Sequence, residues 1–144
     1  NRKTAQEQTV QQAKLICVVG PPGAGKTTYV HKHRFPGEPV WDLDAVALAL
    51  LCGEEARGNI LGVLQSLAIT YLDTIARSEI TRAWFISTSP SQSDWERWRQ
   101  RWGGHVVLLT TDPLECQRRI QERDGHCPDD IRDKINRWWK EWRG

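Results

Sequence analysis

The stretch that decides the fold is residues 14–30, which read KLICVVGPPGAGKTTYV. After its lysine, the run KLICVV is continuously apolar, which is typical of a strand buried on both faces of a parallel sheet. A turn of glycines and prolines follows, and KTTYVHKHR then predicts a helix. A buried strand, a glycine-rich turn and a helix that begins at a lysine together indicate a loop that binds phosphate.

The turn matches the pattern G-x-x-x-x-G-K-T between Gly20 and Thr27. Its backbone N–H groups and the N-terminus of the following helix would form an anion site. Lys26 would contact the β- and γ-phosphates, and the Thr27 hydroxyl would bind Mg²⁺. The sequence therefore predicts binding of a nucleoside triphosphate, ATP or GTP, with Mg²⁺. The predicted contact residues are Gly20, Pro21, Pro22, Gly23, Ala24, Gly25, Lys26, Thr27 and Thr28.

The rest of the chain alternates short apolar runs with helical patterns. The runs VWDLD, RAWFIST and HVVLLTT predict three more strands, and a long helix is expected over NILGVLQSLAITYLDTIARSE. Ser93 is expected to cap the helix DWERWRQRW, and a polar lead-in is expected over residues 1–13. This order predicts one α/β domain over residues 1–144. We expect a three-layer α/β/α sandwich with a mainly parallel sheet of four to five strands.

Composition sets limits on location and partners. The net charge of +2 over 144 residues is too small to indicate a nucleic-acid partner by itself. No apolar stretch approaches the roughly 20 residues that span a bilayer, so no membrane association is expected. The four cysteines have no CxxC spacing, which favours free thiols over a zinc site. With no signal pattern, a cytoplasmic location is expected. The four histidines show no convergent spacing and are taken as non-catalytic.

Two carboxylates follow the second predicted strand. Asp42 and Asp44 are two residues apart, on the same side of an extended chain, and carboxyl ends of parallel strands line the ligand crevice. A carboxylate there could accept the proton of an attacking hydroxyl, a role we assign to Asp44. Asp42 is expected as a structural residue or a contact to metal-bound water. The alternative for Asp44 is a helix cap.

The third predicted strand ends without the Asp-Glu pair that motor-type ATPases use to polarise water. Its end reads WFISTSPS, and no carboxylate appears before Asp94. The hydroxyls available there are weak bases. This absence favours transfer to a bound hydroxyl over hydrolysis.

An arginine-rich segment, DPLECQRRIQERDG, lies in a predicted lid region over residues 113–127. Arg119 and Arg123 are four residues apart and share a helix face. Arginines above a phosphate site would stabilise charge on the transferring oxygens, so we assign both to that role. The alternative is a solvated helix face on which Glu115 and Glu122 pair with these arginines.

Taken together, GPPGAGKTT, DLDAV and DPLECQRRIQERDG resemble small P-loop kinases over roughly residues 14–125. The similar groups are polynucleotide 5′-hydroxyl kinases, zeta-toxin-type kinases and the small kinase-like ATPases of phages. The resemblance implies Asp44 as general base, Lys26 and Thr27 on ATP and Mg²⁺, and Arg119 or Arg123 as lid arginines. One departure concerns the acceptor. Polynucleotide kinases often carry an arginine three residues after the base, where this chain has Ala47.

Six of the eight tryptophans fall in the last third of the chain. Trp95, Trp98 and Trp102 have helical spacing with arginines between them, so this helix could stack on the bases of a nucleic acid. The alternative is that the rings form core or a dimer contact. Trp138 and Trp142, in the last helix, make that helix a candidate interface.

The sequence thus predicts an ATP-dependent kinase that moves the γ-phosphate to a hydroxyl of a nucleic acid or a nucleotide-like acceptor. Two alternatives stay open. One is an ATPase module of a larger assembly, such as that of a phage, and the other is a kinase of a small metabolite. The oligomeric state is not indicated.

Overall fold

The computed structural model describes residues 14–54 and 58–143, so the predicted lead-in over residues 1–13 lies outside the described part. The strands are β1 (Leu15–Val19), β2 (Val40–Trp41), β3 (Ala83–Ser87) and β4 (His105–Leu108). The helices are α2 (Lys26–His33), α3 (Leu43–Leu50), α4 (Gly58–Arg77), α5 (Gln92–Trp102), α6 (Pro113–Asp124) and α7 (Asp129–Arg143).

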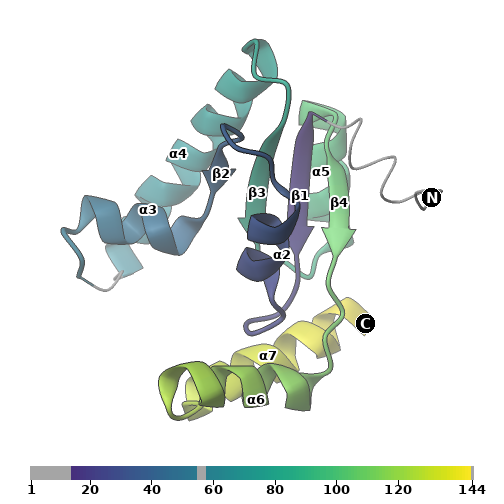
Figure 1. Ribbon diagram of the computed structural model, residues 1–144. Coiled ribbons are helices and arrows are strands. Elements are labelled where there is room, and N and C mark those ends of the chain that lie inside the picture. Colours follow the sequence, from purple (N-terminus) through teal and green to yellow (C-terminus); the bar gives the residue numbers. More distant parts are fainter. Residues whose placement is uncertain (1–13, 55–57, 144) are drawn as a thin grey trace.

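The four strands form one sheet in the order β2-β3-β1-β4. All three strand pairs are parallel: Ile16 of β1 lies opposite Trp84 of β3 and His105 of β4, and Val40 of β2 lies opposite Trp84. The predicted α/β class with a parallel sheet is confirmed. Since β1 is central and is followed by the glycine-rich turn, that turn lies at the middle of the sheet's carboxyl edge (Figure 1).

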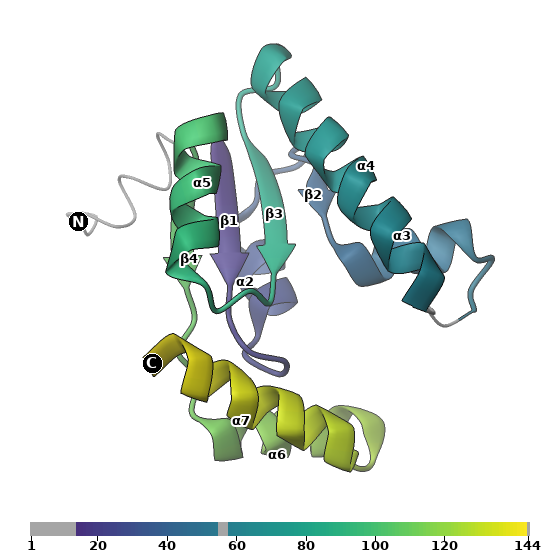
Figure 2. The ribbon, with the colours of Figure 1, turned by 180° about the vertical axis from the view of Figure 1, so that it is seen from behind.

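Helices cover both faces of the sheet, as Figures 1 and 2 show from opposite sides. On one face, Val30 of α2 packs on Ile16, Val18 and Trp84. On the other face, α4 and α5 pack on the alternate residues of β1. That core cluster comprises Leu15, Cys17, Leu72, Ile75 and Ala83, with Tyr71, Phe85, Trp98, Trp102 and Val106 packed against it. The continuous apolar run of β1 is therefore explained by burial on both faces.

The last two helices lie at the carboxyl edge of the sheet, beyond the arrowheads of the strands in both views (Figures 1 and 2). A third core cluster joins them to the glycine-rich turn: Ala24 packs with Cys116 and Ile120 of α6 and with Ile135 of α7. Pro113 occupies the first turn of α6, and the Asp112 carboxylate accepts hydrogen bonds from the N–H groups of Leu114 and Glu115.

Two predictions of where an element begins or ends are wrong. The strand expected over VWDLD is only Val40–Trp41, because the chain turns into α3 at Leu43. Asp42 and Asp44 therefore do not lie on one side of an extended chain. The cap of α5 is Ser91, whose hydroxyl accepts from the N–H of Asp94, rather than Ser93. The cysteines Cys17, Cys52, Cys116 and Cys127 are all free, as predicted.

Helix α4 differs from the expectation that no apolar stretch is long enough to span a bilayer. Its residues Asn59–Arg77 are long and apolar enough to cross a membrane, by length and composition alone. That single helix is weak evidence, because the core helix of a soluble protein meets the same criteria. Leu64, Ala68, Leu72 and Ile75 form a buried stripe along it, and Leu72 and Ile75 pack with β1.

A buried ion pair fixes the segment before β2 to the start of β3. Arg82 Nε lies 2.8 Å from Glu38 Oε2, and the two side chains are only 7% and 11% exposed. The other Glu38 oxygen accepts from Trp84 Nε1 at 3.0 Å and from the Phe35 N–H at 2.8 Å. These hydrogen bonds outweigh burial and lower the pKa of Glu38.

We expect Glu38→Gln to lower the free energy of unfolding by about 3 kcal/mol at pH 7, because it leaves the Arg82 guanidinium buried without a charged partner. Since the folded-state pKa of Glu38 is depressed, its contribution is present above the unfolded pKa and is lost as pH falls through the folded one. The difference in free energy of unfolding between the unsubstituted protein and Glu38→Gln should therefore be smaller in acid. Urea unfolding at pH 7 and pH 3 measures both.

The matched control is Glu96→Gln, which removes an exposed partner of Arg99 and should change stability by less than about 1 kcal/mol. Equal stability of Glu38→Gln and the control at pH 7 would contradict the role given to this pair.

Candidate active site

The turn between β1 and α2 is so closely packed that two positions require glycine. A Cβ on Gly23 would lie 2.6 Å from the Cys116 carbonyl oxygen of α6, and φ at Gly23 is +79°. A Cβ on Gly20 would lie 2.8 Å from the Leu109 carbonyl oxygen, just after β4. Helix α6 and the residues after β4 therefore pack directly against the turn. This close packing shapes a cradle of backbone that a side chain would fill.

Lys26 begins α2 and its ammonium lies back over the turn. Its Nζ donates to the carbonyl oxygens of Gly20 at 2.9 Å and of Pro21 at 2.8 Å. Burial lowers the pKa of Lys26 from 10.5 to about 8, and the charges of Asp44 and Asp42 offset part of this shift. Lys26, the lysine predicted to bind phosphate, is therefore a half-buried cation held by two carbonyl groups. Thr27 and Thr28 follow it in the first turn of α2 and are exposed.

The two carboxylates have different local roles. Asp42 is the N-cap of α3: its Oδ1 accepts from the N–H of Asp44 at 3.1 Å. The capping alternative that the sequence offered for Asp44 therefore belongs to Asp42. Asp44 lies in the first helical turn, and no hydrogen bond to its carboxylate is recorded within the described residues. Its charge favours the protonated forms of Lys26 and Arg123.

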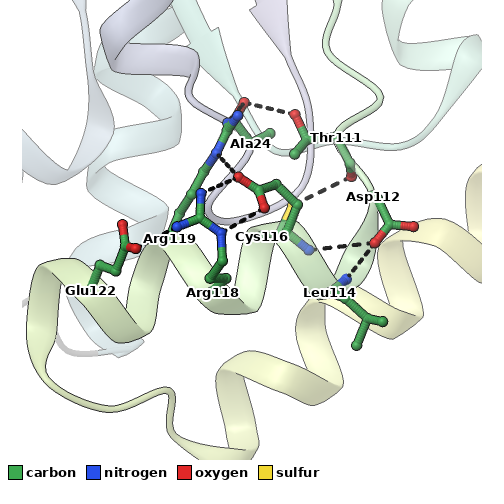
Figure 3. Close-up of polar contacts among 9 residues, drawn as sticks. Ala24, Thr111, Asp112, Leu114, Cys116, Arg118, Arg119 and Glu122 are labelled. Carbon is green, nitrogen blue, oxygen red and sulfur yellow. Dashed lines mark hydrogen bonds and ion pairs between the residues drawn. The ribbon is translucent and has the colours of Figure 1, made fainter.

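Arg119 of α6 contacts the glycine-rich turn. Its Nη1 donates to the Ala24 carbonyl oxygen at 3.1 Å, and Thr111 Oγ1 donates to the same oxygen at 3.0 Å (Figure 3). The Arg119 Nε donates to Glu115 at 3.1 Å, which orients the guanidinium. Arg119 is thus placed at the turn, where the sequence predicted a lid arginine. Thr111 was missed, and the only signal for it was its place directly after the strand HVVLL.

The other arginines of α6 pair with carboxylates. Arg118 binds Glu115 and Glu122 on the exposed side of the helix, so the solvated-face alternative holds for it. Arg123 binds the adjacent Asp124 at 2.9 Å, and this hydrogen bond raises the pKa of Arg123. Arg123 does not contact the turn in this structure, although the charge of Asp44 acts on it.

The tryptophans of α5 are core residues. Trp95 Nε1 donates to the Ser89 carbonyl oxygen at 3.0 Å, and Trp102 Nε1 donates to Asp73 at 2.7 Å. Trp98 packs edge-to-face on Phe85, with ring centroids 5.4 Å apart. These rings cover the sheet rather than forming a platform for bases. The core alternative therefore describes this helix.

Comparison with known proteins shows that the fold of this chain is similar to that of several solved structures. No family model matches the sequence, and no protein of curated function matches it. A chain in the structure of the Pnkp1/Rnl/Hen1 RNA repair complex superposes with a TM-score of 0.73 at 14% identity, covering 97% of this chain. This chain spans 47% of the length of that one, which is less than half.

Two smaller proteins are similar over most of their length. The Deinococcus radiodurans tunicamycin resistance protein has a TM-score of 0.60 at 22% identity, with 92% of this chain and 81% of that one covered. Shikimate kinase from Bacteroides thetaiotaomicron has a TM-score of 0.55 at 22% identity, with 89% and 78% covered. The parallel sheet and these neighbours show that the chain has the α/β fold that these proteins share.

The lowered pKa of Lys26 predicts a pH dependence of nucleotide binding. Below pH 8 the free protein carries the ammonium, and above it the neutral amine must take up a proton to bind phosphate. We expect the affinity for ATP to fall between pH 7 and pH 9, by up to about tenfold per pH unit above 8, with proton uptake on binding. Titration calorimetry in buffers of different ionisation enthalpy measures both. An affinity that stays constant over this range, without proton uptake, would contradict the assignment.

Proposed function

We propose that the chain is an ATP-dependent phosphotransferase that moves the γ-phosphate to a hydroxyl of a nucleic acid or a nucleotide-like acceptor. The observation that carries the proposal is that Lys26 and Arg119 both donate hydrogen bonds to the backbone of the closely packed glycine-rich turn. Asp44, in the first turn of α3, contributes a charge that offsets part of the lowering of the Lys26 pKa. A cation, a carboxylate and arginines around one phosphate site are the parts that transfer to a hydroxyl requires.

On the donor side, the backbone N–H groups of the turn and of the first turn of α2 would hold the triphosphate. The Lys26 ammonium, which binds two carbonyl groups of the loop here, would exchange them for β- and γ-phosphate oxygens. That exchange would give a charged partner to a half-buried cation. Arg119 would stabilise the negative charge on the transferring oxygens from its place on the turn.

On the acceptor side, Asp44 would accept the proton of the attacking hydroxyl and align its oxygen with the γ-phosphorus. The new O–P bond forms as the bond to the β-phosphate oxygen breaks, so ADP leaves. Asp42 holds the start of α3 by capping it and thereby fixes where Asp44 lies. Arg123 would reach the same region if it exchanged Asp124 for a phosphate oxygen.

A magnesium ion fits the residues present. Residues 14–54 and 58–143 contain no group of three or more His, Cys, Asp or Glu side chains that could hold a metal. The ion would therefore rely on phosphate oxygens, water and the exposed Thr27 hydroxyl, with Asp42 near its water shell. When bound, Mg²⁺ neutralises charge on the β- and γ-phosphates.

Among the similar structures, shikimate kinase supports a small-metabolite acceptor as the second candidate. The RNA repair complex favours a nucleic acid and also leaves room for a module that works within an assembly. A cytoplasmic location remains a prediction. The acceptor is identified by incubating the protein with γ-labelled ATP and a panel of 5′-hydroxyl DNA, 5′-hydroxyl RNA, modified-base DNA, nucleosides and shikimate.

We expect Asp44→Asn to reduce phosphoryl transfer by about 10²- to 10⁴-fold, because the variant cannot accept the proton of the attacking hydroxyl. Its affinity for ATP should be unchanged or slightly tighter, because a negative charge near the phosphates is removed. Steady-state kinetics with the preferred acceptor and calorimetry with ATP measure the two effects.

The control is Glu96→Gln, an exposed amide substitution on α5 that should leave transfer unchanged. If Asp44→Asn retains full transfer, Asp44 is not the base. If no acceptor of the panel is labelled and only free phosphate appears, the phosphotransferase proposal fails in favour of the ATPase module.

A further inference from the structure

Helix α4 carries two stripes of residues that are suited to packing. The inner stripe faces the core, where Leu64, Ala68, Leu72 and Ile75 are buried. The second stripe, which we call the outer seam, consists of Ile60, Val63, Leu67, Thr70 and Thr74. Its steps alternate between three and four residues, which is the spacing at which one helix packs along another. The sheet of this chain therefore covers one of two packing faces of α4.

The outer seam is exposed in the middle of the helix. Val63 is 50% exposed and Leu67, one turn further on, is 41% exposed. Helix α3 packs against α4 and adds two more exposed leucines, Leu48 at 46% and Leu50 at 49%. These two helices lie together at the side of the molecule remote from α5 (Figures 1 and 2). Exposed apolar side chains that cluster in this way mark a surface that another molecule covers.

The polar members of the outer seam do not require water. Thr70 Oγ1 donates to the Ser66 carbonyl oxygen at 3.2 Å, and Thr74 Oγ1 donates to the Thr70 carbonyl oxygen at 2.7 Å. Because both hydroxyl groups already have an acceptor within the helix, covering them leaves no donor unsatisfied. The seam can therefore be buried over its whole length, which is about 20 Å at 1.5 Å per residue.

The charges near the outer seam favour a second copy of this chain as its partner. Residues 43–50 and 59–74 contain no lysine or arginine, and their only carboxylates are Asp44 and Asp73. Asp73 is paired with Arg101 of α5. Helices that select a different partner do so through charges that flank the seam, and helices that lie on a bilayer carry lysine or arginine on their polar face. Two copies of an uncharged seam, by contrast, meet without repulsion.

The size of the outer seam predicts a weak association. Two helices of about 10 Å diameter in contact over about 20 Å cover less than the roughly 800 Å² per partner of a standard interface. The exposed leucines of α3 add to this area. We therefore expect an association that depends on protein concentration in the micromolar range.

We propose that two copies of this chain associate through the outer seam of α4, antiparallel about a two-fold axis near Leu67. The two-fold axis places the same seam on both sides of the contact. The antiparallel arrangement keeps the equal ends of the two helix dipoles apart. Val63 and Leu67 are then buried against the second copy. This inference does not depend on the proposed phosphotransferase function.

The test compares double variants by sedimentation velocity over protein concentrations from about 2 to about 200 µM. The seam variant is Val63→Glu with Leu67→Glu, which places like charges across the axis. The control is Ile69→Glu with Leu114→Glu, which changes two exposed apolar residues outside the outer seam, one of them on α4 itself. A third variant, Val63→Lys with Leu67→Lys, is mixed with the seam variant. Circular dichroism checks that each variant is folded.

We expect the unsubstituted protein and the control to change from monomer to dimer over this range, with dissociation constants within about threefold of each other. The seam variant should associate at least about tenfold more weakly, because charged side chains would be buried at the contact. An equimolar mixture of the Glu and Lys variants should form dimers again, because opposite charges then meet across the axis. This rescue distinguishes loss of the contact from loss of folding.

An unsubstituted protein that stays monomeric at every concentration overturns the proposal, and so does a dimer that the seam variant retains. If the seam variant does not fold, Val63→Thr with Leu67→Gln removes apolar surface without adding charge and should weaken the dimer about tenfold. An unchanged dissociation constant in that variant also overturns the proposal. A monomer that binds phosphatidylcholine and phosphatidylserine vesicles through the outer seam would assign this surface to a bilayer instead.

Discussion

The carbonyl oxygen of Ala24 is the point on which the site depends. It accepts one hydrogen bond from Thr111, just after β4, and a second from Arg119 of α6. The turn that would hold phosphate is therefore fixed from outside by two other segments. The missing side chain of Gly23 permits this, since a Cβ there would lie 2.6 Å from the backbone of α6. A loop held in this way keeps its N–H groups oriented without a ligand, which reduces the conformational entropy lost on binding.

The packing of the glycine-rich turn also accounts for the pKa of Lys26. Lys26 is half-buried against the turn, where its ammonium donates to the carbonyl oxygens of Gly20 and Pro21, and burial lowers its pKa to about 8. A desolvated cation held only by carbonyl oxygens gains more from a phosphate than an exposed one would, because electrostatic interactions strengthen where water is excluded. Helix α6 also brings Arg119 to the turn, where its guanidinium donates to the Ala24 carbonyl oxygen.

The sequence predicted the order of strand, glycine-rich turn and helix correctly, and it predicted the surroundings of the turn less accurately. The turn is predictable because glycine, lysine and threonine at that spacing are required by local backbone geometry and ligand chemistry. The class of fold follows from alternating patterns, but the strand order does not, because pairing is non-local. The placement of Asp42 and Asp44 was predicted wrongly because β2 ends after two residues. The end of β2 depends on its pairing with β3, which is a non-local contact. The contact of Thr111 with the turn has no local sequence pattern, since it depends on where a distant segment packs.

We propose that the γ-phosphate goes to an acceptor hydroxyl rather than to water, because Asp44 follows β2 and no Asp-Glu pair ends β3. A single-turnover reaction with γ-labelled ATP, saturating 5′-hydroxyl oligonucleotide and excess protein measures this partition directly. The account predicts that most of the label becomes covalently attached to the oligonucleotide and that little appears as inorganic phosphate. Release of the label as inorganic phosphate at the same rate with and without acceptor would contradict it.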